Sequence, residues 1–389
     1  MALRIIGLIT ALALLAVACS PGEGGGDPPD LLVVVNENGD VALVSAGAAQ
    51  PRTVADVPDD RSAFQPIWLG ADGIVFVERR GGAGALVTVD TEGNEIRRWE
   101  FVTAPFYIYP RPGEGMTAPV VTLRNALQGG LVAELVEVDG TTTGIPGEFP
   151  FFFVWDGEGR VIAHIGNRRL DEVYPSAATV DPNPGDFAAP GVSDGGVVFV
   201  RSSGGRQVLS ISKSGGPVDV AIVPGPAQVV AAGDRVAIRA VATGNATEVM
   251  AQTLPAIPPN ALAVVDLPGA GVEVVTRDPV ALFFWDKTGN RLLFAEVREA
   301  DSTVLQWHVW ESGLVTDFGT FTPPPDWMAS FIPFFDQYAN SMSLWSSDGS
   351  AFAYPAVVDG DAGVWVQALD AGEPERVTSG SWVAWGPGR

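Results

Sequence analysis

The sequence predicts an all-β fold made of short strand units, and two observations lead to this prediction. The 389 residues include 46 Gly and 31 Pro, and both residue types destabilise helix interiors. Short runs of β-branched and aromatic residues, such as 32–35 and 197–200, are bounded by Asp-Gly and Asn-Gly pairs, which suit tight hairpin turns. The 47% hydrophobic content is too high for a disordered chain. We therefore expect strands and turns, and no amphipathic helix of ten residues in the body.

A longer unit recurs along the chain. It consists of a strand ending near Trp, a Gly-containing turn and a second apolar strand. The steps between Trp68, Trp155 and Trp285 fit a period of about 43 residues, which is typical of the four-stranded blades of a β-propeller. The clear copies are 66–77, 153–163, 284–294 and 343–353, the weaker ones are 192–200 and 231–238, and a degenerate one lies near 109–121.

The two ends of the body complement each other. Residues 381–389 begin a unit and stop after one strand and its turn, whereas 31–54 supply three strands without a leading Trp strand. Pairing them completes one blade and removes the last exposed sheet edge. We therefore expect a single propeller over 31–389, closed by its N- and C-terminal strands. Eight blades are predicted, with seven as the alternative, from unit starts near 68, 111, 155, 191, 231, 285 and 345 plus the shared blade.

The Trp-x-x-Asp-Gly unit at 345–349 and its counterpart at 68–77 resemble the WD40-like propeller repeats of the TolB family. They resemble the propeller domain of prolyl oligopeptidases more loosely. The resemblance covers essentially 31–389 and is poor at 106–146. It implies a propeller fold. TolB carries an α/β domain before its propeller, where this chain has only a short polar segment, so the resemblance does not extend to TolB's partners.

The N-terminal segment is typical of a bacterial lipoprotein. Residues 1–18 have a positive Arg4 followed by an uncharged run that is too short for a stable membrane span. Small residues then precede Cys19, the only cysteine, which we expect to be lipidated. An ordinary secretory peptide with an incidental Cys is the alternative. Residues 19–30 are rich in Gly and Pro and are expected to be a flexible tether.

Charge limits the partners. The formal net charge is −23, with 46 acidic residues against 23 Lys and Arg, whereas nucleic-acid binding requires clustered cations. We expect no nucleic-acid partner, membrane contact through the lipid anchor only, and a monomer. The expected location is the bacterial cell envelope, with the body in the periplasm or outside the cell.

Few residues indicate a catalytic, metal-binding or cofactor-binding function. The chain has two histidines, His164 and His308, and its one cysteine is assigned to lipid, so no zinc site of His and Cys is predicted. No Gly-x-Ser-x-Gly elbow or Walker loop occurs. We therefore predict no catalytic residue, no metal and no cofactor.

The most distinctive segment is an insertion over 321–341, rich in Pro and aromatic residues. Connections between blades lie on the face where propellers often bind ligands, and aromatic rings with Asp and Gln suit carbohydrate or peptide recognition. The interpretation that we favour for the rings is that they plug the wide axis of the eight-bladed ring and pack on adjacent blades, and ligand binding is the alternative. The predicted ligand-binding residues are Asp336, Gln337 and Tyr338, followed by Trp327 and His308.

These observations favour a binding or scaffold module in the cell envelope, for a protein or a glycan. An enzyme is the less favoured alternative, namely a propeller-type glycosidase or lyase acting on envelope or extracellular carbohydrate. A structural spacer is a third option. Three converging carboxylates at the channel mouth would favour the enzyme, and an apolar rim without them would favour binding.

Overall fold

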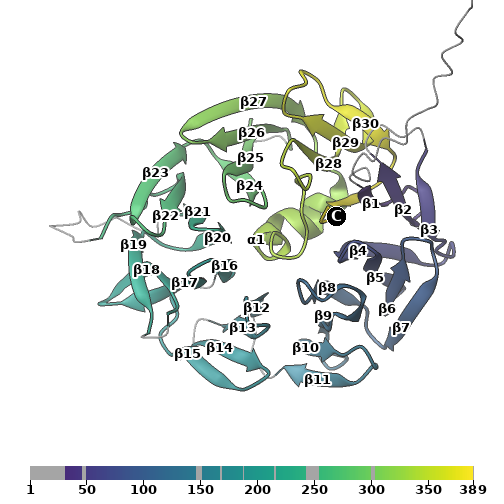
Figure 1. Cartoon of the computed structure of the whole chain (residues 1–389), viewed down its shortest axis with the longest axis horizontal. Helices are drawn as coiled ribbons and strands as arrows, with labels where there is room; N and C mark the ends of the chain where they lie inside the picture. The colour runs from purple at the N-terminus through teal and green to yellow at the C-terminus, as the bar shows by residue number, and fades with distance from the viewer. Residues whose placement is uncertain are drawn as a thin grey trace, which may run out of the picture.

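In the computed structural model, the chain folds into a ring of eight sheets around one axis (Figure 1). Blades are numbered from the one that contains the first and the last described strands, and the chain then follows the ring in order. The described residues are 31–45, 50–145, 151–166, 169–186, 188–213, 216–241, 254–298 and 303–388.

Each blade is an antiparallel sheet whose strands follow one another from the axis outward (Figure 1). In that order, blade 1 is β31 (Trp382–Trp385), β1 (Leu31–Val35), β2 (Val41–Ser45) and β3 (Arg52–Ala55), and blade 2 is β4 (Ser62–Leu69), β5 (Gly73–Arg80), β6 (Ala83–Asp90) and β7 (Glu95–Phe101). Blade 3 is β8 (Pro105–Pro110), β9 (Val120–Asn125), β10 (Leu131–Val136) and β11 (Thr142–Ile145). Blade 4 is β12 (Phe151–Trp155), β13 (Val161–Ile165), β14 (Arg169–Tyr174) and β15 (Ala178–Asp181). Blade 5 is β16 (Gly191–Ser193), β17 (Gly196–Ser203), β18 (Arg206–Ile211) and β19 (Val218–Val223), and blade 6 is β20 (Ala227–Ala232), β21 (Arg235–Ala240), β22 (Leu262–Asp266) and β23 (Gly271–Thr276). Blade 7 is β24 (Val280–Trp285), β25 (Arg291–Val297), β26 (Leu305–Glu311) and β27 (Leu314–Phe321). Blade 8 is β28 (Ala351–Val358), β29 (Asp361–Ala368) and β30 (Glu375–Thr378).

The ring closes through the two ends of the chain. Strand β31 pairs antiparallel with β1, so that Val33 lies opposite Ala384 and Val35 lies opposite Trp382. The C-terminal strand thus becomes the innermost strand of blade 1, and no inner edge remains open there. This arrangement confirms the predicted single propeller, its eight blades and its closure.

The predicted turns form, with two changes of position, one of which is at Asp194-Gly195, where the left-handed φ of +132° belongs to Gly196. At Asp348-Gly349 the glycine has φ +70°, and the Asp348 carboxylate accepts a hydrogen bond from Ser350 N at 2.9 Å. At Asp72-Gly73 the sequence placed the left-handed residue at Gly73, but the structure places it at Gly70, with φ +62°. The reason is that Gly73 already begins strand β5, so the chain reverses earlier.

Burial follows position in the ring. Inner strands are covered on both faces by neighbouring blades, and residues 382–385 of β31 are at most 4% exposed. Such strands read as continuous apolar runs. The outermost strands β23 and β27 are largely exposed. Each buried Val or Leu side chain contributes roughly 1.5–3 kcal/mol, so the contacts between blades hold the ring together.

Blade 8 departs from the pattern because a long segment precedes it. Where the other blades have a regular inner strand, Trp345 makes an isolated bridge to Phe352. The preceding residues 322–342, named here the axial plug, enter the channel of the ring. The helical turns of the plug are η2 (Trp327–Phe331), η3 (Ile332–Phe334) and α1 (Phe335–Tyr338).

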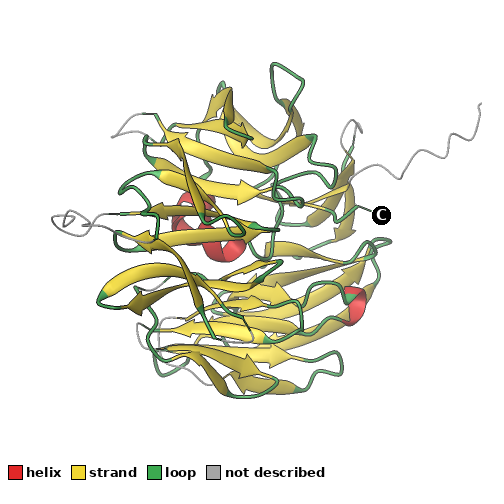
Figure 2. Cartoon of the chain, turned by 60° about the vertical axis from the view of Figure 1, so that its left-hand side comes forward, coloured by secondary structure: helices red, strands yellow, loops and turns green. Residues whose placement is uncertain are grey.

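The plug lies at the centre of the ring when viewed along the axis (Figure 1) and inside it when viewed obliquely (Figure 2). A separate 3-10 turn, η1 (Gly115–Thr117), lies in the connection between β8 and β9. Within the described part of the chain, the helices are all too short or too polar to cross a bilayer.

Candidate functional site

The plug packs into the channel through one side of its helical turns. Trp327, Phe331, Phe335, Tyr338 and Met342 recur every three or four residues, and each is at most 4% exposed. Phe331 stacks on Trp327 with 4.4 Å between ring centroids and on Tyr338 with 4.9 Å. The rings therefore fill the axis, as the favoured interpretation of the insertion expected.

Gln337 connects the plug to the inner edge of blade 4. Its Oε1 accepts a hydrogen bond from Phe153 N at 2.9 Å, and its Nε2 donates to Phe153 O at 2.7 Å. Nε2 also donates to the Tyr107 hydroxyl at 2.9 Å. The side-chain amide thus pairs with a strand backbone as another strand would. Because Gln337 is 5% exposed, this pairing satisfies groups that water does not reach.

Asp336 is the buried acid of the plug. It is 3% exposed, and burial raises the pKa of its carboxyl to about 7, although backbone hydrogen bonds from Gln337, Asp336 itself and Ala189 lower it. The bond from Gln337 N measures 3.2 Å. This carboxyl changes its charge near neutral pH inside the protein, where no ligand can reach it without displacing the plug.

The remaining predicted residues fall into two places. Trp327 is 0% exposed and Tyr338 is 4% exposed, both within the plug, and the Tyr338 hydroxyl donates to Phe106 O at 3.3 Å. His308 lies on β26 in blade 7, stacked on Phe294 and with Nδ1 2.9 Å from an Asp317 oxygen. The structure therefore brings four of the five residues together and leaves His308 in a different blade. Cys19 lies outside the described residues.

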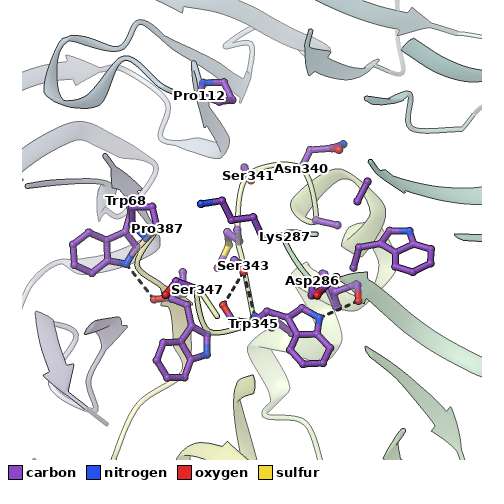
Figure 3. A pocket seen from close by; sticks show the side chains of 18 of the residues that line it. Trp68, Pro112, Asp286, Lys287, Asn340, Ser341, Ser343, Trp345, Ser347 and Pro387 are labelled. Carbon is purple, nitrogen blue, oxygen red and sulfur yellow. Dashed lines mark hydrogen bonds between the residues drawn. The ribbon is translucent and has the colours of Figure 1, made fainter. Parts of the chain in front are cut away.

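A funnel-shaped pocket of about 500 Å³ lies at one end of the plug. It is named here the axial funnel (Figure 3). Its wall consists of the first turns of blades 1, 2, 3, 7 and 8 and the end of the β20 strand of blade 6, and its floor is the C-terminal part of the plug, 339–343. Inner strands run in one direction along the axis, so the residues that end them meet at this mouth.

The tryptophans of the repeat fix the rim of this pocket. In four blades, the indole N–H donates to a carbonyl on the inner strand of the preceding blade, which ties neighbouring blades together beside the axis. The indole of Trp385, which also lines the funnel, has no such partner within the described residues. The four bonds are Trp68 to Ala384 O at 3.2 Å, Trp155 to Tyr109 O at 3.0 Å, Trp285 to Val230 O at 3.0 Å and Trp345 to Phe284 O at 3.2 Å.

Two charged residues occur among the described residues that line the funnel, Asp286 and Lys287. The Asp286 carboxylate is 5% exposed and accepts hydrogen bonds within its own turn, from Asn290 N at 2.8 Å and the Thr288 hydroxyl at 2.7 Å. Lys287 is exposed and points into the funnel (Figure 3), and no ion pair to it is found in the described part of the chain. The funnel therefore offers one free ammonium group beside turn backbone and the hydroxyls of Ser341 and Ser347.

The predicted ligand-binding residues lie on the insertion or on β26, and none of them lines the funnel. The signal for the funnel was present in the repeated turns, since turns that follow the first strands of several units line the same mouth. Asp286 and Lys287 directly follow Trp285 in one of these turns. Lys287 is one of only two lysines in the chain, which also singles it out.

Comparison with known proteins supports the fold. No family model and no curated protein matches the chain. The crystal structure of a eukaryotic initiation factor superposes with a TM-score of 0.55 at 10% identity, over 93% of this chain and 100% of that one. At this identity the likeness concerns the shared architecture alone.

Two further solved structures are similar at lower scores. TolB from Acinetobacter baumannii gives a TM-score of 0.40 at 13% identity, over 73% of this chain and 61% of that one. An oligogalacturonate lyase in complex with manganese gives 0.46 at 10% identity, over 91% and 86%. No functional residue is transferred from any of these proteins.

Proposed function

We propose that this chain is a lipid-anchored protein of the bacterial cell envelope whose propeller binds an envelope protein or glycan at the axial funnel. The observation that carries the proposal is the geometry of that mouth. Turns from several blades converge on one cavity, and the plug closes its far side. A site built on a rigid ring has little conformational entropy to lose when a ligand binds.

The polar groups of the funnel support binding of a polar polymer. Lys287 has no carboxylate partner among the described residues, and hydroxyl and backbone groups surround it. In a chain with a net charge of −23, this ammonium is the one cationic group among the described residues that line the funnel, and the Asp286 carboxylate beside it is held by its own turn. An acidic group on the ligand is therefore the expected contact for Lys287.

An enzymatic function, a glycosidase or lyase, would require converging acids at this mouth. Asp286 is the one carboxylate among the described lining residues, and turn hydrogen bonds hold it. The described residues contain no cluster of three or more His, Cys, Asp or Glu that could hold a metal ion. We therefore base the proposal on binding.

The test is a pull-down from lightly crosslinked bacterial envelopes with the full chain as bait. Lys287→Ala is expected to lower partner recovery several-fold, because it removes the free ammonium group of the funnel. Lys213→Ala is the matched control, since Lys213 is exposed and does not line the funnel. Equal recovery with both variants would remove the funnel from the proposal.

The anchor is tested separately. Globomycin blocks the signal peptidase that acts on lipoprotein precursors, so the precursor should accumulate in treated cells. A Cys19→Ser variant should release the body from the membrane fraction. If treatment causes no accumulation, Cys19 is not a lipidation site, and the binding proposal then stands without the anchor.

A further inference from the structure

A second cavity lies at the opposite end of the plug, where the inner strands begin. It measures about 310 Å³ and is named here the aromatic pocket. Blades 2, 3 and 4 form its outer wall and the plug forms its inner wall. The residues that line it include Phe64, Arg79, Phe106, Leu131, Ala329 and Phe334.

Arg79 is the one charged residue among the described residues that line this pocket. Its guanidinium carbon lies 3.4 Å from the centroid of the Phe64 ring, and Nη2 makes a single long contact of 3.5 Å to Pro105 O. No ion pair to Arg79 is found within the described residues. Burial lowers the pKa of the guanidinium, although Tyr338 and Asp326 raise it, and an arginine remains charged under such conditions.

The neighbouring arginines differ from Arg79 in having carboxylate partners. Arg80 Nε lies 2.8 Å from an Asp60 oxygen, and both Arg61 and Arg98 bind Glu78. Side chains alternate along a strand, so Glu78 and Arg80 point to one face of β5 and Arg79 points to the other. Glu78 and Asp60 are therefore engaged on the opposite face. On the pocket side, the exposed Asp326 of the plug acts on the Arg79 charge, but no ion pair joins the two within the described residues, so Arg79 faces the pocket with donors left over.

Three of the other polar side chains of the pocket, those of Gln337, Tyr338 and Tyr107, are already engaged, and the Ser330 hydroxyl also lines the pocket. The Gln337 amide pairs with Phe153 and Tyr107, and the Tyr338 hydroxyl donates to Phe106 O. The rest of the wall is mainly aromatic and aliphatic. A ligand that fits this surface carries one anionic group for Arg79 and an otherwise apolar body.

We propose that the aromatic pocket binds small monocarboxylates with an apolar body. The carboxylate pairs with the free edge of the Arg79 guanidinium, whose planar fork matches two carboxylate oxygens. The apolar body lies against the aromatic wall. The volume is at the lower end of the range for small-molecule sites, which excludes a folded partner. Water-poor walls strengthen the ion pair relative to one at the surface. This proposal is independent of the funnel.

The test uses isothermal titration calorimetry on the full chain with 3-phenylpropionate and with its neutral analogue 3-phenylpropanamide. We expect one-to-one binding of the carboxylate and at least tenfold weaker binding of the amide, because loss of a charge-assisted bond costs about a factor of ten or more. Arg79→Met should remove the preference. Arg80→Met is the matched control and should keep it, because Arg80 faces Asp60. Thermal melting confirms that both variants fold.

A second pair of variants keeps the test independent of Arg79. Ala329 is exposed at the pocket wall, so Ala329→Trp should block the pocket and abolish binding without disturbing the core. Met328→Trp, at the adjacent position outside the lining, should bind normally. Three results would each overturn the proposal: no binding of 3-phenylpropionate, equal binding of acid and amide, or a preference that survives Arg79→Met.

Discussion

The two ends of the plugged channel are built from different parts of the sequence. The axial funnel is made of turns that recur in every repeat, with Lys287 as its free charge. The aromatic pocket is made of strand beginnings and of the plug, with Arg79 as its free charge. The comparison teaches that repeated turns form the wall of the funnel and the plug only its floor, whereas the plug forms the whole inner wall of the aromatic pocket. The ends should therefore respond differently to substitution.

The largest expected effect lies at the inner edge of blade 4. Gln337→Ala leaves Phe153 N and Phe153 O without partners in a buried place, and each unpaired group costs about 1–3 kcal/mol. We expect a loss of about 3 kcal/mol or more in the free energy of unfolding, measured in urea. Gln50→Ala, at an exposed position, should change it by less than about 0.5 kcal/mol. Similar small losses for both would mean that the plug is not anchored there.

Asp336→Asn should change the pH dependence of stability. The pKa of the Asp336 carboxyl is about 7 in the folded chain against an ordinary 3.8, so the unfolded state loses this proton first. Stability then falls as the pH rises from about 4 to about 7 and stays lower above that. Asn remains neutral, so the variant should be more stable than the natural chain by roughly 2–4 kcal/mol at pH 8. The two should differ little at pH 4. Parallel curves across this range would contradict the burial of this acid.

Two tryptophans at the rim of the axial funnel can be compared with each other, because only one of them has an indole hydrogen bond within the described residues. Trp285→Phe removes a hydrogen bond of 3.0 Å to Val230 O, whereas the Trp385 indole N–H has no partner within the described residues. Both substitutions lose similar packing. Trp285→Phe should therefore cost about 1 kcal/mol more than Trp385→Phe in urea unfolding. Equal losses would show that the indole bonds add nothing to the joining of blades.

The smallest expected effect on stability is that of Lys287→Ala. The side chain is exposed and makes no ion pair within the described residues, so the free energy of unfolding should change by less than about 0.5 kcal/mol. The melting curve should overlay that of the natural chain even when partner recovery falls. A loss of 1 kcal/mol or more would assign Lys287 a structural role.

The architecture could be predicted because its signals repeat. Several copies of the Trp and Gly unit fixed the period, and the incomplete units at 31–54 and 381–389 fixed the closure through β1 and β31. Pairing of strands between distant segments is otherwise difficult to infer from one sequence, and here the missing strand of one end matched the surplus strand of the other.

The site was harder to predict because its decisive features occur once. The spacing of Trp327, Phe331, Phe335, Tyr338 and Met342 is helical, a signal for one buried side that was not used. The insertion was expected to plug the axis, and the predicted ligand-binding residues were placed on the same segment. Arg79 carried no local signal, since its lack of a carboxylate partner depends on Glu78 and Asp60 being used across the strand. Such a property arises only from the three-dimensional packing.

The most direct test of the central claim, that the plug is a fixed wall between two separate sites, is hydrogen exchange followed by mass spectrometry on the full chain. Plug amides are hydrogen-bonded within the channel, for example Ala339 N to Phe335 O at 2.7 Å and Met342 N to Tyr338 O at 2.9 Å. The account predicts that peptides covering 335–342 exchange as slowly as those of the inner strand β24. Exchange as fast as in exposed turns, while β24 stays protected, would contradict it.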